Sequence, residues 1–199
     1  MEDNISHTHK TQFTRTHYLE RPNFVESGKL PPQALELEEA VLGALMLEQD
    51  VINEVLETLK PDTFYKDAHK KIYAAILELF NASEPIDILT VVQQLRKNSE
   101  LEVCGGPAYI SQLTNKVSSS ANLEFHARIL AQKYVQRELI KVASQITQKA
   151  YEESTDVFEL IESAEKNLFN ISEGVVQSNF ENLKDVLRDA IKQIEENST

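Results

Sequence analysis

The chain has 199 residues, of which 41% are hydrophobic and 26% charged, and its net charge is −12 at pH 7. A globular chain of this length can bury a core without disulfides or metals. It has no apolar run of about 18 residues, the length of a membrane span, and no N-terminal secretory pattern. The single cysteine, Cys104, has no second cysteine to pair with, so we expect a protein of the reducing cytoplasm.

The composition also indicates the fold class. Five glycines, six prolines and no tryptophan provide few turns, which favours long helices over sheets. We therefore predict an all-α protein: a compact helical bundle, a long antiparallel helical hairpin and a C-terminal helix. Acidic residues outnumber basic ones by 32 to 20, and no segment has an excess of basic residues. Because phosphate neutralisation dominates affinity for nucleic acids, we expect weak or no nucleic-acid binding by this chain. The acidic surface serves solubility or docks a basic protein.

Residues 1–30 lack apolar periodicity and are rich in Thr, Ser, His and Asn, so we predict a disordered tail. Residues 31–118 form the predicted globular bundle. Apolar residues recur there at helical spacing over 36–45, 50–59, 67–80 and 87–95. A fifth helix opens at Gly105-Gly106-Pro107, since proline suits the first helical position.

Residues 119–174 form the predicted hairpin. Residues 122–151 contain no proline or glycine, and their apolar stripe predicts a helix of roughly 30 residues, about 45 Å long. A turn follows at 152–155, and Asp156 is a good N-cap for a second helix that ends near Gly174. Two helices joined by so short a turn must lie antiparallel.

Residues 175–199 contain one more amphipathic helix. An isolated helix of this length is marginal in water, so its apolar stripe needs a surface to cover it. It either folds back onto the bundle or docks on another protein surface. The stripe consists of Leu183, Val186, Leu187, Ala190, Ile191 and Ile194.

We find no pattern for catalysis or for a resident cofactor. The chain has no phosphate-binding Gly-x4-Gly-Lys-Ser/Thr motif, and His69 lacks the partners of a metal-binding helix motif. His7, His9 and His17 lie in the tail, where nothing imposes a ligand geometry. We interpret Glu38-Glu39 as solvated charge and Cys104 as a buried apolar residue. This chain is therefore predicted to hold no catalytic, cofactor or metal site of its own.

Several motifs resemble one family in the right order. They include Leu35-Glu36-Leu37-Glu38-Glu39-Ala40-Val41-Leu42-Gly43-Ala44, Asp62-Thr63-Phe64-Tyr65, Glu84-Pro85-Ile86-Asp87, Gly105-Gly106-Pro107-Ala108-Tyr109, Arg137-Glu138-Leu139-Ile140 and Leu168-Phe169-Asn170-Ile171. Together these resemble the N-terminal domain of bacterial replicative DNA helicases of the DnaB type, over about residues 31–196. The resemblance implies a hexameric enzyme that unwinds duplex DNA with ATP and magnesium during replication. It also implies that the ATPase domain lies outside this chain.

The resemblance further implies the partners. N-terminal domains pair through their hairpins into a collar of three dimers, the collar recruits the C-terminal domain of primase, and helicase loaders belong to the same system. The helix over 175–199 is the implied linker, which docks on the neighbouring subunit's ATPase domain through the six stripe residues given above. The primase-docking candidates implied in this way are Tyr109, Ile140 and Ile146.

The residues themselves support a dimer. Phe158 and Phe169 flank the inner stripe of the hairpin, beyond what one partner helix covers, and exposed apolar patches mark interfaces. The dimerisation candidates are Phe158, Leu160, Ile161, Leu168 and Phe169. The alternative is that both phenylalanine rings tuck beneath the bundle. Two other functions stay open at this point: a stand-alone helical adaptor for replication proteins without an ATPase part, and a helical DNA-binding protein, which the net charge opposes.

Overall fold

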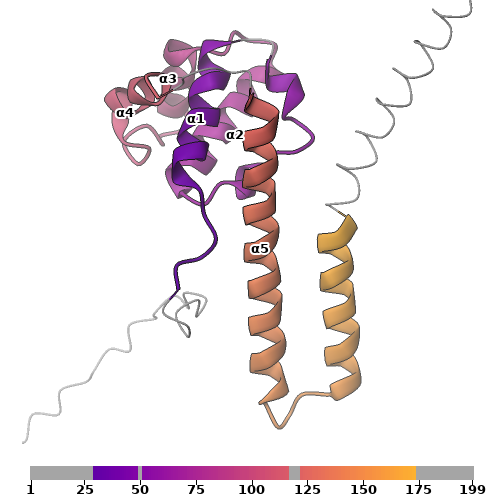
Figure 1. Cartoon of the computed structure of the whole chain (residues 1–199). Coiled ribbons are helices and arrows are strands. Elements are labelled where there is room, and N and C mark those ends of the chain that lie inside the picture. Colours follow the sequence, from indigo (N-terminus) through magenta and orange to yellow (C-terminus); the bar gives the residue numbers. More distant parts are fainter. Residues whose placement is uncertain (1–28, 49–50, 117–121, 174–199) are drawn as a thin grey trace, which may run out of the picture.

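The computed structural model describes residues 29–48, 51–116 and 122–173. Within these ranges the chain contains helices and no strands, which confirms the predicted fold class (Figure 1). A compact head is followed by a long hairpin that projects from it. The elements are α1 (Leu35–Leu47), η1 (Val51–Glu54), η2 (Pro61–Thr63), α2 (Asp67–Asn81), α3 (Ile88–Lys97), α4 (Gly106–Thr114), α5 (Leu123–Ala150) and an unlabelled helix over 157–173.

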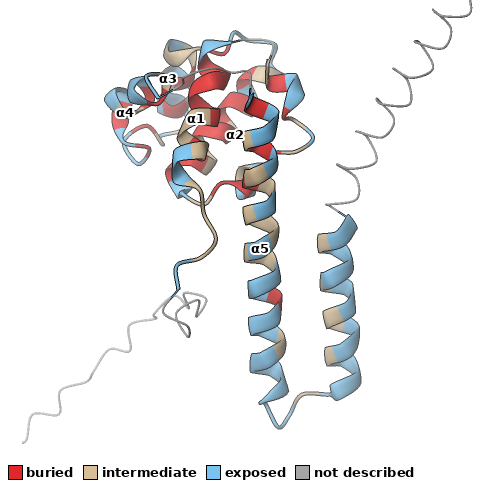
Figure 2. Cartoon of the chain, in the orientation of Figure 1, coloured by how far each residue is buried: buried red, intermediate tan, exposed pale blue. Residues whose placement is uncertain are grey.

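Helix α1 is the centre of the head. It contacts α2, α3, α4 and α5, and every residue from Val41 to Met46 is buried. Gly43 lies within this buried run. Figure 2 shows the buried residues gathered in the head, while most of the hairpin is exposed. The head is thus a single core built around one helix.

Local signals explain where the other helices begin. Asp87 has extended backbone geometry, and its carboxylate accepts hydrogen bonds from the backbone N–H groups of Leu89 (2.7 Å) and Thr90 (2.9 Å). The Thr90 hydroxyl in turn accepts from the Asp87 N–H at 2.9 Å. This reciprocal capping box satisfies donors that the first turn of α3 leaves free.

The predicted helix over 50–59 is wrong in length. The structure has only the short 3-10 helix η1, followed by turns. The β-branched side chains of Val51, Ile52 and Val55 lower helix propensity, and the tighter turn still buries Ile52 and Val55.

The hairpin has the predicted antiparallel form (Figure 1). Helix α5 has 28 residues, and its first part packs on the head through Leu123, Ala127 and Leu130. Farther along, Val142 is only 6% exposed but Leu139 is 43% exposed. The inner stripe that the sequence predicts is therefore only partly covered in one chain. No helix of the described residues is long and apolar enough to cross a membrane.

Candidate functional site

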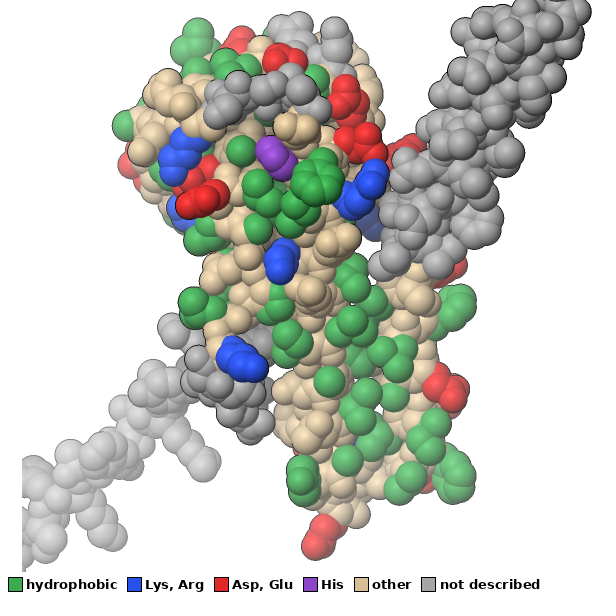
Figure 3. Space-filling model, in the orientation of Figure 1, with side chains coloured by type: hydrophobic (Ala, Val, Ile, Leu, Met, Phe, Trp, Pro, Cys, Tyr) green, Lys and Arg blue, Asp and Glu red, His purple; other side chains and the backbone are tan. Residues whose placement is uncertain are grey.

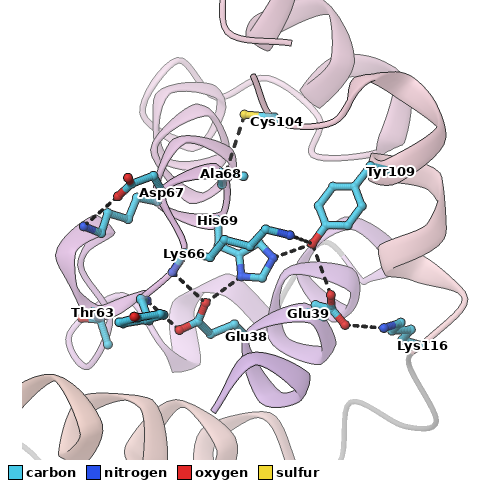
Figure 4. A network of polar contacts seen from close by, with 12 residues as sticks. Glu38, Glu39, Thr63, Lys66, Asp67, Ala68, His69, Cys104, Tyr109 and Lys116 are labelled. Carbon is cyan, nitrogen blue, oxygen red and sulfur yellow. Dashed lines mark hydrogen bonds and ion pairs between the residues drawn. The ribbon is translucent and has the colours of Figure 1, made fainter. Parts of the chain in front are cut away.

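A buried carboxylate and a buried histidine lie at the junction of α1 and α2. Glu38 is 1% exposed and His69 is fully buried. Glu38 Oε2 lies 2.6 Å from His69 Nδ1, and the two carboxylate oxygens also accept the backbone N–H groups of Tyr65 (2.6 Å) and Lys66 (3.4 Å). Figure 4 shows these bonds converging on Glu38. The carboxylate thus caps the segment that leads into α2 and pairs with that helix.

This arrangement corrects one sequence interpretation, since Glu38 is not solvated charge. The sequence does contain a signal for the burial of Glu38. Glu38 lies on the same helical face as Val41, Leu42 and Leu45 of the core. A charged residue within an apolar stripe is buried only when it is paired, and His69 is that partner.

The network continues from His69 to the surface through Tyr109 of α4. The Tyr109 hydroxyl oxygen lies 2.7 Å from His69 Nε2, 2.8 Å from Lys66 Nζ and 3.2 Å from Glu39 Oε1. Glu39 forms an ion pair with Lys116. The dashed lines in Figure 4 follow this chain from the core outward.

The environment in this network shifts the pKa values of Tyr109 and Glu39. Burial, and after it the charge of the nearby Glu39 carboxylate, raise the pKa of Tyr109 to about 12. For Glu39, burial opposes ionisation, but the hydrogen bond and charge of Lys116 outweigh it and lower the pKa of the carboxyl. Both shifts favour a neutral phenol beside an ionised carboxylate.

Gly105 makes room for Tyr109. Its φ is +94°, a conformation that favours glycine. A Cβ at this position would lie 2.9 Å from Cβ of Tyr109. The first glycine of Gly105-Gly106-Pro107 is therefore needed both for the backbone turn and for the position of the tyrosine.

Arg137 attaches the hairpin to the head. Its guanidinium donates hydrogen bonds to the carbonyl oxygens of Pro32 (3.0 Å), Asp62 (3.2 Å) and Thr63 (2.7 Å). It also lies 5.7 Å from the ring centroids of Tyr65 and Tyr134. Residues 62–66 are thus held by Arg137 through their carbonyl groups and by Glu38 through their N–H groups.

A second candidate surface lies along the hairpin. Phe158 is 83% exposed and Phe169 62%, so the alternative that these rings tuck beneath the bundle is wrong. Ile161 and Leu168 are about half exposed, whereas Leu160 is partly covered. Figure 3 shows hydrophobic side chains spread along the hairpin. Four of the five dimerisation candidates therefore form an open apolar face.

The primase-docking candidates lie apart. Tyr109 is partly exposed on α4, whereas Ile140 (42% exposed) and the partly buried Ile146 belong to the hairpin part of α5. Figure 1 shows α1 between α4 and α5. The structure therefore brings Tyr109 together with His69 and Glu39, but not with the two isoleucines. The linker candidates, Leu183 to Ile194, lie outside the described residues.

A family model described as the DnaB-like helicase N-terminal domain matches residues 30–132. The chain belongs to this family. The match spans the head and the first part of α5, and it confirms the resemblance seen in the sequence motifs.

Individual proteins similar in sequence to this chain also belong to the replicative DNA helicases. The replicative DNA helicase DnaB of Rhodothermus marinus is 39% identical over 170 residues, which cover 85% of this chain and 18% of that protein. The replicative DNA helicase DnaC of Bacillus subtilis is also 39% identical over 170 residues, covering 85% of this chain and 37% of that protein. The chain thus spans well under half the length of these relatives.

Solved structures show the same DnaB-like fold. The N-terminal domain of DnaB helicase from Mycobacterium tuberculosis superposes with a TM-score of 0.68 at 35% identity, covering 71% of this chain and 99% of that one. A DnaB-like replicative helicase, described with its interactions with primase, superposes with a TM-score of 0.60 at 24% identity. It covers 71% of this chain and 31% of that one.

The described part of this DnaB-like domain holds no group of three or more metal-ligating side chains.

Sequence reasoning missed Glu38, His69 and Arg137 as positioning residues. Arg137 stands in the Arg137-Glu138-Leu139-Ile140 motif, but the carbonyl groups that it binds lie 74 to 105 positions away. No local pattern reveals such partners.

Proposed function

We propose that this chain is the N-terminal assembly and primase-docking module of a hexameric replicative DNA helicase. The observation that carries the proposal is the match to the whole length of a solved DnaB N-terminal domain. In the complete enzyme, ATP and magnesium drive the unwinding of duplex DNA at the replication fork. That step belongs to an ATPase domain outside the 18–37% of the relatives that the chain spans.

The assembly role of the module is supported by the open hairpin face. Phe158, Ile161, Leu168 and Phe169 leave apolar area in solvent that a second copy of the hairpin would cover. We propose a dimer through this face, with three dimers forming the collar of the hexamer. The helix over 175–199 then extends to the ATPase domain of the neighbouring subunit, in a cytoplasmic complex that a loader places on DNA.

The docking role is supported by two solvent-facing positions. The partly exposed Tyr109 side chain on α4 contacts His69 Nε2 through its hydroxyl, and Ile140 is 42% exposed on α5. Rigid aromatic and aliphatic anchors are typical of interface hot spots, each costing roughly 1–4 kcal/mol when truncated. A primase domain that uses both positions bridges two separate patches, with Ile146 at the edge of the second.

Calorimetric titration with the cognate primase C-terminal domain tests this function. We expect Tyr109→Ala and Ile140→Ala to weaken binding at least tenfold, about 1.4 kcal/mol. Leu89→Ala is the matched control, because Leu89 is an exposed apolar residue (73%) on α3. Wild-type affinity in both variants would remove these residues from the docking surface, and a primase domain that does not bind the chain at all would contradict the docking role.

A further inference from the structure

Three groups of the protein itself surround the hydroxyl of Tyr109. A phenol donates one hydrogen bond and accepts two. His69 Nε2, Lys66 Nζ and Glu39 Oε1 all lie within 3.2 Å of the phenol oxygen. The hydroxyl is therefore engaged inside the protein, and the partly exposed ring is the part of Tyr109 that can serve a partner.

We infer that Glu38 and His69 are positioning residues, which hold the Tyr109 ring ready for a protein partner through one shared set of hydrogen bonds. The inference rests on the proposed function for the identity of that partner. His69 is fully buried, so it cannot touch a docked protein. An effect of His69 on docking must pass through the side chains that it contacts, Glu38 and Tyr109, and of these only Tyr109 is partly exposed.

The ring itself is confined on several sides. The His69 ring lies nearly parallel to it, at an interplanar angle of 5° and a centroid distance of 6.1 Å. Lys66 Nζ lies 4.3 Å from the ring centroid, and Gly105 lets the backbone approach Cβ. An anchor that is immobile before binding loses little conformational entropy on docking.

Groups from separate parts of the head hold the hydroxyl of Tyr109. Lys66 Nζ donates a hydrogen bond to the phenol oxygen, and the Glu39 carboxylate accepts one from the phenol O–H. His69 Nε2 lies 2.7 Å from the same oxygen, while His69 Nδ1 lies 2.6 Å from the Glu38 carboxylate. Glu38 therefore orients the His69 ring, and the His69 ring contacts the phenol.

A double-mutant cycle tests the route through Tyr109. In His69→Asn the side-chain amide still reaches Glu38 from the position of Nδ1 but no longer reaches Tyr109. We expect His69→Asn to weaken binding of the primase C-terminal domain about fivefold, and Tyr109→Phe to do the same. In the Tyr109→Phe background, His69→Asn should change the affinity less than twofold. Independent effects that multiply would overturn the inference.

NMR of the tyrosine rings in the wild-type chain needs neither a variant nor a partner. We expect the two sides of the Tyr109 ring to give separate signals, because the ring is confined and flips slowly. A fast-flipping ring would overturn the inference. If the spectra agree but primase does not bind the wild-type chain, the proposed function fails and the positioning of Tyr109 stands.

Discussion

The Glu38 carboxylate lies 2.6 Å from His69 Nδ1, with 1% of Glu38 and none of His69 exposed. Because desolvation offsets much of the attraction in a buried pair, such a pair adds little net stability against an apolar replacement. Removing one partner is costly, since the other stays buried and uncompensated. The pair joins α1 to α2, and the contact of His69 with Tyr109 extends the network to α4.

Glu38→Ala should destabilise the fold by about 3–5 kcal/mol, because it leaves His69 and the N–H groups of Tyr65 and Lys66 without their acceptor. Urea denaturation followed by circular dichroism measures the change. Glu36→Ala, at an exposed position of the same helix, is the control and should stay within about 0.5 kcal/mol of wild type. Equal effects at both positions would show that the buried network is not needed for stability.

Arg137→Ala should cost about 3 kcal/mol, because three carbonyl oxygens lose a charged donor. Arg128→Ala removes an arginine from the same helix, but its pairing with Glu124 is about half exposed, so we expect less than about 1 kcal/mol. Arg137→Lys keeps the positive charge but loses the several N–H donors of the planar guanidinium. Its stability should therefore lie closer to that of Arg137→Ala than to that of the wild type. A Lys variant as stable as wild type would mean that charge alone holds the hairpin to the head.

Phe158→Asp should reduce the oligomeric state of the chain, because pairing of the hairpins would desolvate the new carboxylate. Light scattering at micromolar concentration measures the mass. Val103→Asp introduces the same charge at an exposed apolar position of the head (67%) and should leave the mass unchanged. A wild-type chain that is strictly monomeric would contradict the hairpin interface.

The stability of the fold should fall between pH 10 and about pH 12 through Tyr109. Burial and then the Glu39 carboxylate raise the pKa of its phenol to about 12 in the folded state, whereas an unfolded tyrosine ionises near pH 10. In this window the unfolded chain releases a proton that the folded chain keeps, so alkali favours unfolding.

Comparison with Tyr109→Phe isolates this contribution. Burial also raises the pKa of Tyr73, but Tyr73 is present in both proteins, so its effect cancels. Urea denaturation at pH 9, 10, 11 and 12 should show a steeper loss of stability in the wild type. Parallel curves of unfolding free energy against pH for the two proteins would contradict the raised pKa of Tyr109.

Local sequence determined most of the helices. The prediction of a helix over 67–80 agrees with α2, the helix over 87–95 with α3, and the helix over 122–151 with α5. Periodicity, caps and helix breakers act within a few residues, so they can be read along the chain. The short turn at 152–155 likewise fixed the antiparallel hairpin.

Tertiary structure alone decided which polar residues are buried and what they bind. Glu38 and His69 are 31 positions apart, His69 and Tyr109 are 40 apart, and Tyr109 and Glu39 are 70 apart. Two adjacent glutamates therefore have different environments: Glu38 is enclosed in the core, and Glu39 lies at the edge with Lys116. Whether a charge is buried depends on the groups that the fold brings to it, because desolvation is offset only by partners within hydrogen-bond distance.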